Sequence, residues 1–227
     1  MMKLYIGNKN YSSWSMRPWV LLRAFGIPFE EVKLRFDFTP GSDFYQALAK
    51  ITPAGKVPVL VEDDGFAVWD TLAITEYLAE RHPEQALWPR EVRARARARS
   101  LCAEMHGGFG ALRSLCPMNV EASLPEIGAE KLESSAALRQ DLARMDALWS
   151  EALQVSGGPF LFGTFCAADA YFAPVVMRVT RYGLPLSPAS QAYARAVEQS
   201  PGVAAWVADA LAEQDFLDFE EPYRKQP

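Results

Sequence analysis

The chain has 227 residues, of which 50% are hydrophobic, and a formal net charge of −5. This length and composition suit one or two globular domains with a sizeable core. The negative charge argues against a broad nucleic-acid surface, and no apolar run reaches the length of a membrane span. Residues 1–10 lack the apolar stretch of a secretory signal, so we expect a cytoplasmic protein that binds neither nucleic acid nor membrane.

The cysteines and histidines are few and do not form a metal-binding pattern. Cys102, Cys116 and Cys166 form no CxxC pair, and His82 and His106 have no metal-ligand spacing with a cysteine or a carboxylate. Thiols used as small core residues in a reducing compartment explain the cysteines. We therefore expect no metal site.

Strand and helix patterns alternate in the first eighty residues. Gly26 ends the first helical pattern, and Asp64-Gly65 supplies the tight turn of a hairpin. The predicted order is strand, helix, strand, helix, hairpin and helix, at residues 3–7, 15–25, 29–36, 42–50, 57–70 and 71–82.

The rest of the chain carries helical patterns only. Residues 82–91 contain two prolines and polar side chains, which is typical of a linker. Helices are predicted at residues 90–115, 138–153, 166–181, 189–199 and 202–213. We therefore expect a mixed α/β domain at residues 1–82, a linker at 83–90 and an all-helical domain at 91–227.

A cluster of serines, Ser12, Ser13 and Ser15, lies where the first predicted strand gives way to the first helix. Serines in this place commonly cap a helix. A hydroxyl there can also donate a hydrogen bond to an anion, because a helix N-terminus has free N–H groups and the positive end of the helix dipole. The residues alone leave both interpretations open.

Three segments in the right order resemble the cytosolic glutathione transferase family. Residues 11–19, "YSSWSMRPW", look like the serine-type signature Ser-Ser-x-Ser-x-Arg of the zeta class. Residues 52–83 resemble the glutathione-binding half of the family, and residues 158–176 resemble the helix-capping motif of its helical domain. The resemblance implies a thioredoxin-like α/β N-terminal domain, βαβ-αββα, followed by an all-α domain. It also implies a cis peptide bond at Val57-Pro58.

The resemblance assigns the thiolate contact to the serine cluster. Ser12 stands five residues before Arg17, the spacing of serine-type relatives, so we expect its hydroxyl to face the glutathione sulfur. Ser13 is the second choice, and Ser15 is expected to cap the helix. Trp14 stands where the zeta class has cysteine.

The resemblance also implies contacts to the rest of glutathione. Asp70 would accept the ammonium, and Thr71 with the N-terminus of its helix would bind the γ-glutamyl carboxylate. Val57 would offer its backbone to the cysteinyl amide, and Lys56 would meet the glycyl carboxylate. The family usually has Glu or Gln followed by Ser at this point, so Asp70-Thr71 matches in type but not in identity. Asp-Thr before an apolar helix is also typical of an ordinary helix cap.

Residues of the helical half are expected to wall the pocket for the second substrate. The resemblance places "EMHGGFG" there, so Met105, His106 and Phe109 are candidates. Core packing is the alternative for Met105, and a surface position is the alternative for His106. Cys166 stands where the family has Ser or Thr, and sulfur accepts hydrogen bonds weakly, so we expect only half of a structural capping box, in which Asp169 accepts the Cys166 N–H.

The function implied by the resemblance is that of a homodimeric glutathione transferase that uses glutathione as co-substrate and no metal. The thiolate would attack a small hydrophobic electrophile. Two alternatives stay open: a glutathione-dependent isomerase of the maleylacetoacetate type, and a non-catalytic glutathione-binding or scaffold protein. A disulfide reductase is disfavoured because no cysteine precedes Cys102.

Overall fold

The N-terminal part of the chain folds around a small mixed sheet. In the computed structural model, which describes residues 1–226, the four strands have the order β2-β1-β3-β4. β1 pairs parallel with β2, and β3 pairs antiparallel with both β1 and β4. The strands are β1 (Lys3–Ile6), β2 (Glu30–Lys33), β3 (Val59–Val61) and β4 (Ala67–Trp69).

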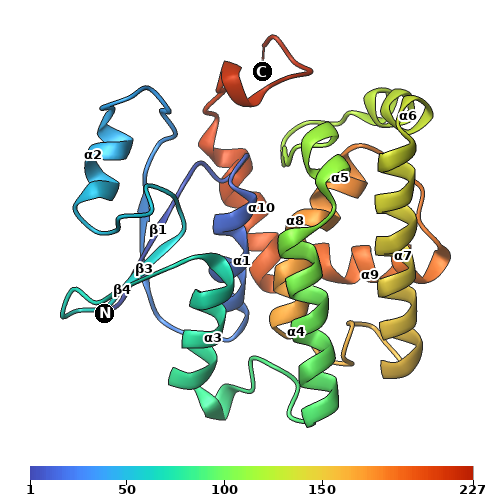
Figure 1. Ribbon diagram of the computed structural model, residues 1–227, viewed down its shortest axis with the longest axis horizontal. Helices are drawn as coiled ribbons and strands as arrows, with labels where there is room; N and C mark the ends of the chain where they lie inside the picture. Colours follow the sequence, from blue (N-terminus) through green and yellow to red (C-terminus); the bar gives the residue numbers. More distant parts are fainter. Residues whose placement is uncertain (227) are drawn as a thin grey trace.

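Helices cover both faces of this sheet. Alternation along β1 buries Leu4 and Ile6 in the main core with helix α1 (Ser13–Ala24) and helix α3 (Thr71–Arg81). On the opposite face, Tyr5 packs in a second core cluster with helix α2 (Asp43–Ala49). Figure 1 shows α1 and α3 between the sheet and the helical part, and α2 on the far side. The thioredoxin-like prediction is confirmed.

The remainder of the described chain is helical, as predicted. After a short 3-10 turn (Pro83–Gln85) come α4 (Val92–Gly107), α5 (Gly110–Leu115), α6 (Pro125–Ser134), α7 (Ala136–Ser156), α8 (Ala167–Arg181), α9 (Pro188–Gln199), α10 (Pro201–Glu213) and a second 3-10 turn (Asp218–Glu220). Helix α8 is buried along almost its whole length and packs against α1, α4 and α9. The Asp169 carboxylate accepts the Cys166 N–H at 2.9 Å, which is the half of the capping box expected at the start of this helix.

The prediction of one continuous helix at residues 90–115 is wrong, because the structure has two helices there, α4 and α5. Phe109 has a left-handed backbone with φ of 55°, and α5 starts after it. At Gly108 a Cβ atom would lie 2.7 Å from the Glu104 carbonyl oxygen, so the chain bends away at a glycine. Helix α6 was not predicted.

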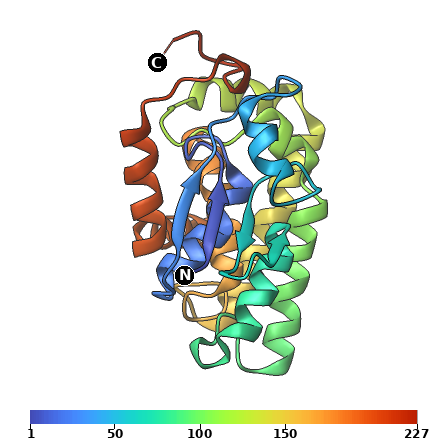
Figure 2. The same ribbon diagram turned by 90° about the vertical axis from the view of Figure 1, so that its left-hand side faces the viewer.

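The C-terminal segment returns to the N-terminal part. Helix α10 packs against α1, and Leu217 enters the second core cluster beside the sheet. Figure 2 shows α10 running alongside the sheet. The peptide bond between Val57 and Pro58 is cis, as expected, and so is the one between Gly158 and Pro159. None of the helices in residues 1–226 is long and apolar enough to cross a membrane.

Candidate active site

The turn between β1 and α1 places two of the serines in a buried hydrogen-bond chain. Ser12 is at the N-cap position of α1, but its side chain does not cap the helix. Its hydroxyl donates to Ser15 Oγ at 2.7 Å, and Ser15 Oγ also accepts the Gly7 N–H at 3.2 Å. Both serines are buried. The hydrogen of Ser12 is therefore committed within the protein.

Ser13 has a different environment, because two arginines donate hydrogen bonds to it. It is the first residue of α1 and is half-buried. Its carbonyl oxygen accepts a hydrogen bond from Arg17 Nη1 at 2.8 Å, and its hydroxyl oxygen accepts one from Arg178 Nη2 at 3.3 Å. Burial lowers the pKa of Arg17 to about 9 and that of Arg178 to about 10, so both cations are costly in this place.

A cavity of about 300 Å³ opens beside these residues. It lies between the N-terminal part and the helical part, and all four residues expected to bind glutathione line it. Its full lining is Trp14, Ala54, Lys56, Val57, Pro58, Trp69, Asp70, Thr71, His106 and Arg113. Trp14 lines the cavity, whereas Ser13 and Ser15, its neighbours in the sequence, do not.

The residues expected to wall the second pocket divide into two groups. His106 lines the cavity. Met105 and Phe109 are buried in the main core and do not line it. Arg113, which the sequence did not single out, lines the cavity and lies over the Trp14 ring at 5.1 Å.

Asp70 begins helix α3 and also faces the cavity. Its Oδ1 atom accepts the N–H groups of Leu72 at 2.8 Å and Ala73 at 3.4 Å, which caps the helix. Its Oδ2 atom does not take part in the cap. The Thr71 hydroxyl donates to the Trp14 carbonyl at 3.1 Å and so ties α3 to the serine turn. Capping and ligand binding are compatible, since one Asp70 oxygen stays available.

A polar chain crosses from the helical part to Asp70. The Tyr171 hydroxyl lies 2.7 Å from His106 Nδ1, and His106 Nε2 lies 3.5 Å from Asp70 Oδ2. Burial raises the pKa of Tyr171, so the phenol keeps its proton. When this phenol donates to Nδ1, the neutral His106 ring carries its own proton on Nε2, the nitrogen nearer to Asp70. The role of Tyr171 was not predicted from the sequence, because a tyrosine in an apolar helix is more typical of core packing.

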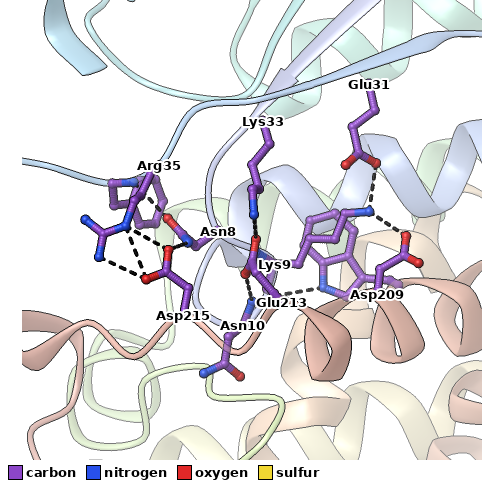
Figure 3. Close-up of polar contacts among 11 residues, drawn as sticks. Asn8, Lys9, Asn10, Glu31, Lys33, Arg35, Asp209, Glu213 and Asp215 are labelled. Carbon is purple, nitrogen blue, oxygen red and sulfur yellow. Dashed lines mark hydrogen bonds and ion pairs between the residues drawn. The ribbon is translucent and has the colours of Figure 1, made fainter. Parts of the chain in front are cut away.

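The C-terminal segment fixes the turn that carries the serines (Figure 3). The Asn8 amide donates to Asp215 at 2.8 Å, and the Lys9 N–H donates to Glu213 at 2.9 Å. The Tyr11 hydroxyl donates to Glu221 at 2.8 Å. None of these contacts was predicted from the sequence.

The Lys9 side chain is the buried centre of this contact. Its ammonium lies 2.7 Å from Glu31 and 2.6 Å from Asp209, and 4.4 Å from the centre of the Trp19 ring. The Lys9 carbonyl accepts the Trp206 indole N–H at 3.0 Å. Strand β2, α1 and α10 are thus joined at one residue, directly before the serine turn.

Residues 1–226 contain no group of three or more histidines, cysteines or carboxylates that could bind a metal ion. All three thiols are free and buried, and burial raises the pKa of Cys116 to about 11. These thiols are therefore protonated core residues.

Comparison with known proteins finds similarity to one family. A family model described as the N-terminal domain of glutathione S-transferase matches residues 11–81. Rat maleylacetoacetate isomerase is 28% identical over 186 residues, which cover 82% of this chain and 81% of the rat protein. Maleylacetoacetate isomerase of Pseudomonas aeruginosa is 32% identical over 102 residues, 45% of this chain and 47% of that protein.

Solved structures extend the similarity to both halves of the chain. A glutathione transferase homologue from Burkholderia, with bound glutathione, has a TM-score of 0.66 at 25% identity, covering 94% of this chain and 99% of that one. Maleylacetoacetate isomerase from Anaeromyxobacter dehalogenans, also with bound glutathione, has a TM-score of 0.65 at 26% identity, covering 92% and 96%. Residues 11–81 thus match the N-terminal domain of glutathione S-transferase, and both halves of the chain are similar to proteins of that family.

Proposed function

We propose that the protein binds glutathione in the cavity beside α1 and adds the glutathione thiolate to a small electrophile that carries a carboxylate. One observation carries this proposal. The cavity brings together the cation Lys56, the N-terminus of α3 and the carboxylate Asp70, and it has a further cation, Arg113. Glutathione has two carboxylates and one ammonium, so the charges of the cavity complement it.

Each end of the tripeptide has a counterpart in the cavity. The γ-glutamyl end would lie at Asp70 and Thr71, where the α3 N-terminus favours a carboxylate. The cysteinyl amide would pair with the backbone of Val57, and the glycyl carboxylate with Lys56. The sulfur would then point toward the start of α1 and its serines.

Thiolate formation alone explains only a small part of the rate. Lowering the thiol pKa by about two units from roughly 8.5 raises the thiolate fraction at neutral pH about 25-fold. The less basic thiolate is also a weaker nucleophile, by about eightfold for a Brønsted slope near 0.45, so the net gain is about threefold. Most of the acceleration must come from holding the second substrate against the sulfur.

Isomerisation of a maleyl-type diacid is the reaction that the relatives favour. The thiolate would form a C–S bond to one carbon of the cis double bond. The π electron pair of that double bond would move into the conjugated carbonyl and give an enolate. After rotation about the new single bond, the enolate would re-form the double bond and expel the thiolate, with no net change in atoms. Arg113 supports this proposal, because a diacid presents a carboxylate to a cation at the cavity wall.

Conjugation of glutathione to a small hydrophobic electrophile is the second candidate. It uses the same thiolate, and the Trp14 and Trp69 rings give the cavity apolar surface for such a substrate. The two candidates differ in the fate of the adduct, which is released in conjugation and cleaved in isomerisation. A binding protein without catalysis would use the same glutathione contacts and form no product.

We also propose that the protein is a homodimer, as its family resemblance implies. An apolar groove of about 450 Å³ between α4 and α7, bordered by the exposed Val155, is available for contacts outside the active site. Sedimentation equilibrium would give the mass in solution, and a monomer at micromolar concentration would contradict this proposal.

Two measurements test the proposed function. Calorimetric titration with glutathione is expected to give saturable heat that is reduced in Asp70→Ala. Incubation with glutathione and a maleyl diacid, followed by NMR, is expected to show conversion to the trans isomer with glutathione recovered unchanged. Conjugation of an aryl halide without isomerisation would favour the second candidate. Absence of heat at millimolar glutathione would contradict binding altogether.

A further inference from the structure

We propose that Ser13 donates the hydrogen bond that steadies the glutathione thiolate, and that Arg178 is the positioning residue that polarises this hydroxyl. The inference rests on the proposed function, because it requires glutathione in the cavity. It differs from the expectation drawn from signature spacing, which favours Ser12.

The hydrogen bonds distinguish the two serines. Ser12 already donates its hydroxyl hydrogen to Ser15 at 2.7 Å, and it is buried. Ser13 is half-buried, and its oxygen accepts from Arg178 while its own hydrogen has no acceptor among the described residues. An oxygen that accepts from a cation becomes a stronger donor through its own hydrogen. Ser13 directly precedes Trp14, which lines the cavity, so Ser13 carries the hydroxyl hydrogen that is free to meet an anion at that edge of the cavity.

The guanidinium of Arg178 has no carboxylate partner in residues 1–226. It is 7% exposed, and it donates to the carbonyl oxygens of Arg113 and Cys116 and to Ser13 Oγ. A buried cation that pairs only with neutral groups leaves the site with excess positive charge. A thiolate at Ser13 would supply the missing negative charge.

A second buried cation strengthens the same field. Arg17 is 2% exposed, and its guanidinium pairs only with the carbonyl oxygens of Ser13 and Tyr171. After burial, the charges of Arg178 and Arg113 lower the pKa of Arg17, and the charge of Arg113 lowers the pKa of Arg178, so these charges act on the same region. The positive end of the α1 dipole adds to them.

The other titratable groups around Arg178 do not cancel this charge at neutral pH, with one exception. Burial raises the pKa values of Cys116, Tyr171 and Tyr182, so these groups are neutral. Glu220 is the exception, because it is an acid that acts on Arg178 from the C-terminal 3-10 turn, although burial raises its pKa as well. The charged and titratable groups that face the Arg178 guanidinium are Arg17, Arg113, Cys116, Tyr182 and Glu220, and Tyr171 faces the neighbouring Arg17.

The step itself is a proton equilibrium. The glutathione thiol releases its proton to solvent, and the resulting thiolate accepts the Ser13 hydrogen; no covalent bond to the protein forms. Removing the Arg178 charge weakens Ser13 as a donor and weakens the positive field. We therefore expect the pKa of bound glutathione to rise by about one unit in Arg178→Gln, at the lower end of what a nearby charge produces.

Ultraviolet absorbance of the bound thiolate, titrated against pH in the full-length protein, tests the inference. Ser13→Ala and Arg178→Gln are each expected to raise the thiol pKa by about one unit, and the double variant is expected to raise it by less than the two shifts added together. Arg178→Lys keeps the charge and is expected to raise the thiol pKa by less than Arg178→Gln does. Arg144→Gln, which removes an exposed arginine on α7, is the matched control and is expected to leave the titration unchanged.

The possible failures are distinguishable. Glutathione affinity is measured at a pH where the thiol is protonated, and wild-type protein that does not bind there contradicts the proposed function itself. If wild-type binds, a pKa shift in Ser12→Ala with none in Ser13→Ala overturns the inference, and so do shifts in Ser13→Ala and Arg178→Gln that simply add. If Arg178→Gln unfolds, the Ser13→Ala titration decides, and no shift of the thiol pKa in Ser13→Ala overturns the inference.

Discussion

The Tyr171 hydroxyl and His106 Nδ1 lie 2.7 Å apart and connect a buried helix of the helical part to the cavity. His106 Nε2 in turn lies 3.5 Å from Oδ2 of Asp70, which belongs to the N-terminal part. The two halves of the site are therefore joined by a chain of polar contacts, and its members can be removed one at a time.

Tyr171→Phe is expected to lower kcat/KM about three- to tenfold, the effect of losing one neutral hydrogen bond. Without the phenol, His106 is free to change its tautomer and to turn from Asp70. Steady-state kinetics across pH measures this, because the variant is expected to change the pH dependence of KM. Tyr182→Phe removes another buried phenol outside the cavity and serves as the control. Equal losses in both variants would contradict the role given to His106.

Asp70→Asn and Asp70→Ala separate capping from binding. Asparagine keeps a cap acceptor and tolerates the left-handed backbone of Asp70, with φ of 74°, so the free energy of unfolding is expected to change little. Alanine is expected to destabilise the protein by about 1 kcal/mol or more. Both variants are expected to weaken glutathione binding, because both remove the charge that meets the ammonium. Calorimetry and urea unfolding measure the two effects, and unchanged affinity in Asp70→Asn would contradict the assigned contact.

Glu213 tests the contact between the C-terminal segment and the serine turn. Its buried carboxylate accepts the Lys9 N–H and pairs with Lys33 at 2.7 Å. Glu213→Ala leaves a buried donor without an acceptor and is expected to lower the free energy of unfolding by about 1–3 kcal/mol. Glu213→Gln keeps an acceptor and is expected to cost less. Urea denaturation measures both, with the exposed Glu133→Ala as control; equal costs in all three would contradict the account.

Asp169 gives the stability a defined pH dependence. Burial raises its pKa from 3.8 to about 6 in the folded protein. Between these values the folded state holds the proton more strongly than the unfolded chain, so this group makes stability fall as pH rises through the window. Asp169→Asn keeps a cap acceptor but cannot titrate, and it is expected to remove this slope. Urea unfolding at several pH values compares the two proteins, and parallel pH profiles would contradict the assignment.

Much of the fold could be predicted because its signals are local. The strand of residues 3–7, the Asp64-Gly65 turn and the amphipathic stripe of α7 each specify an element over a few residues. Helix α6 was missed because it is short and polar, with only Gly128 buried. The break at Phe109 was missed even though two glycines precede it, because helical spacing continues on both sides.

The site was harder to predict because its geometry depends on contacts far apart in the sequence. Lys56, Asp70 and Thr71 follow a recognisable order along the chain, and the structure brings them to one cavity. The Arg178–Ser13 and Tyr171–His106 contacts join residues 165 and 65 positions apart, and no local pattern indicates them. The contact between the C-terminal segment and residues 8–11 has the same long-range character.

A crystal structure of the protein with glutathione tests the central claim most directly. The account predicts the γ-glutamyl end at Asp70 and Thr71, the glycyl carboxylate at Lys56, and the sulfur within hydrogen-bond distance of the Ser13 hydroxyl. Glutathione bound away from this cavity, or a sulfur that contacts Ser12 and leaves Ser13 paired only with Arg178, would contradict it.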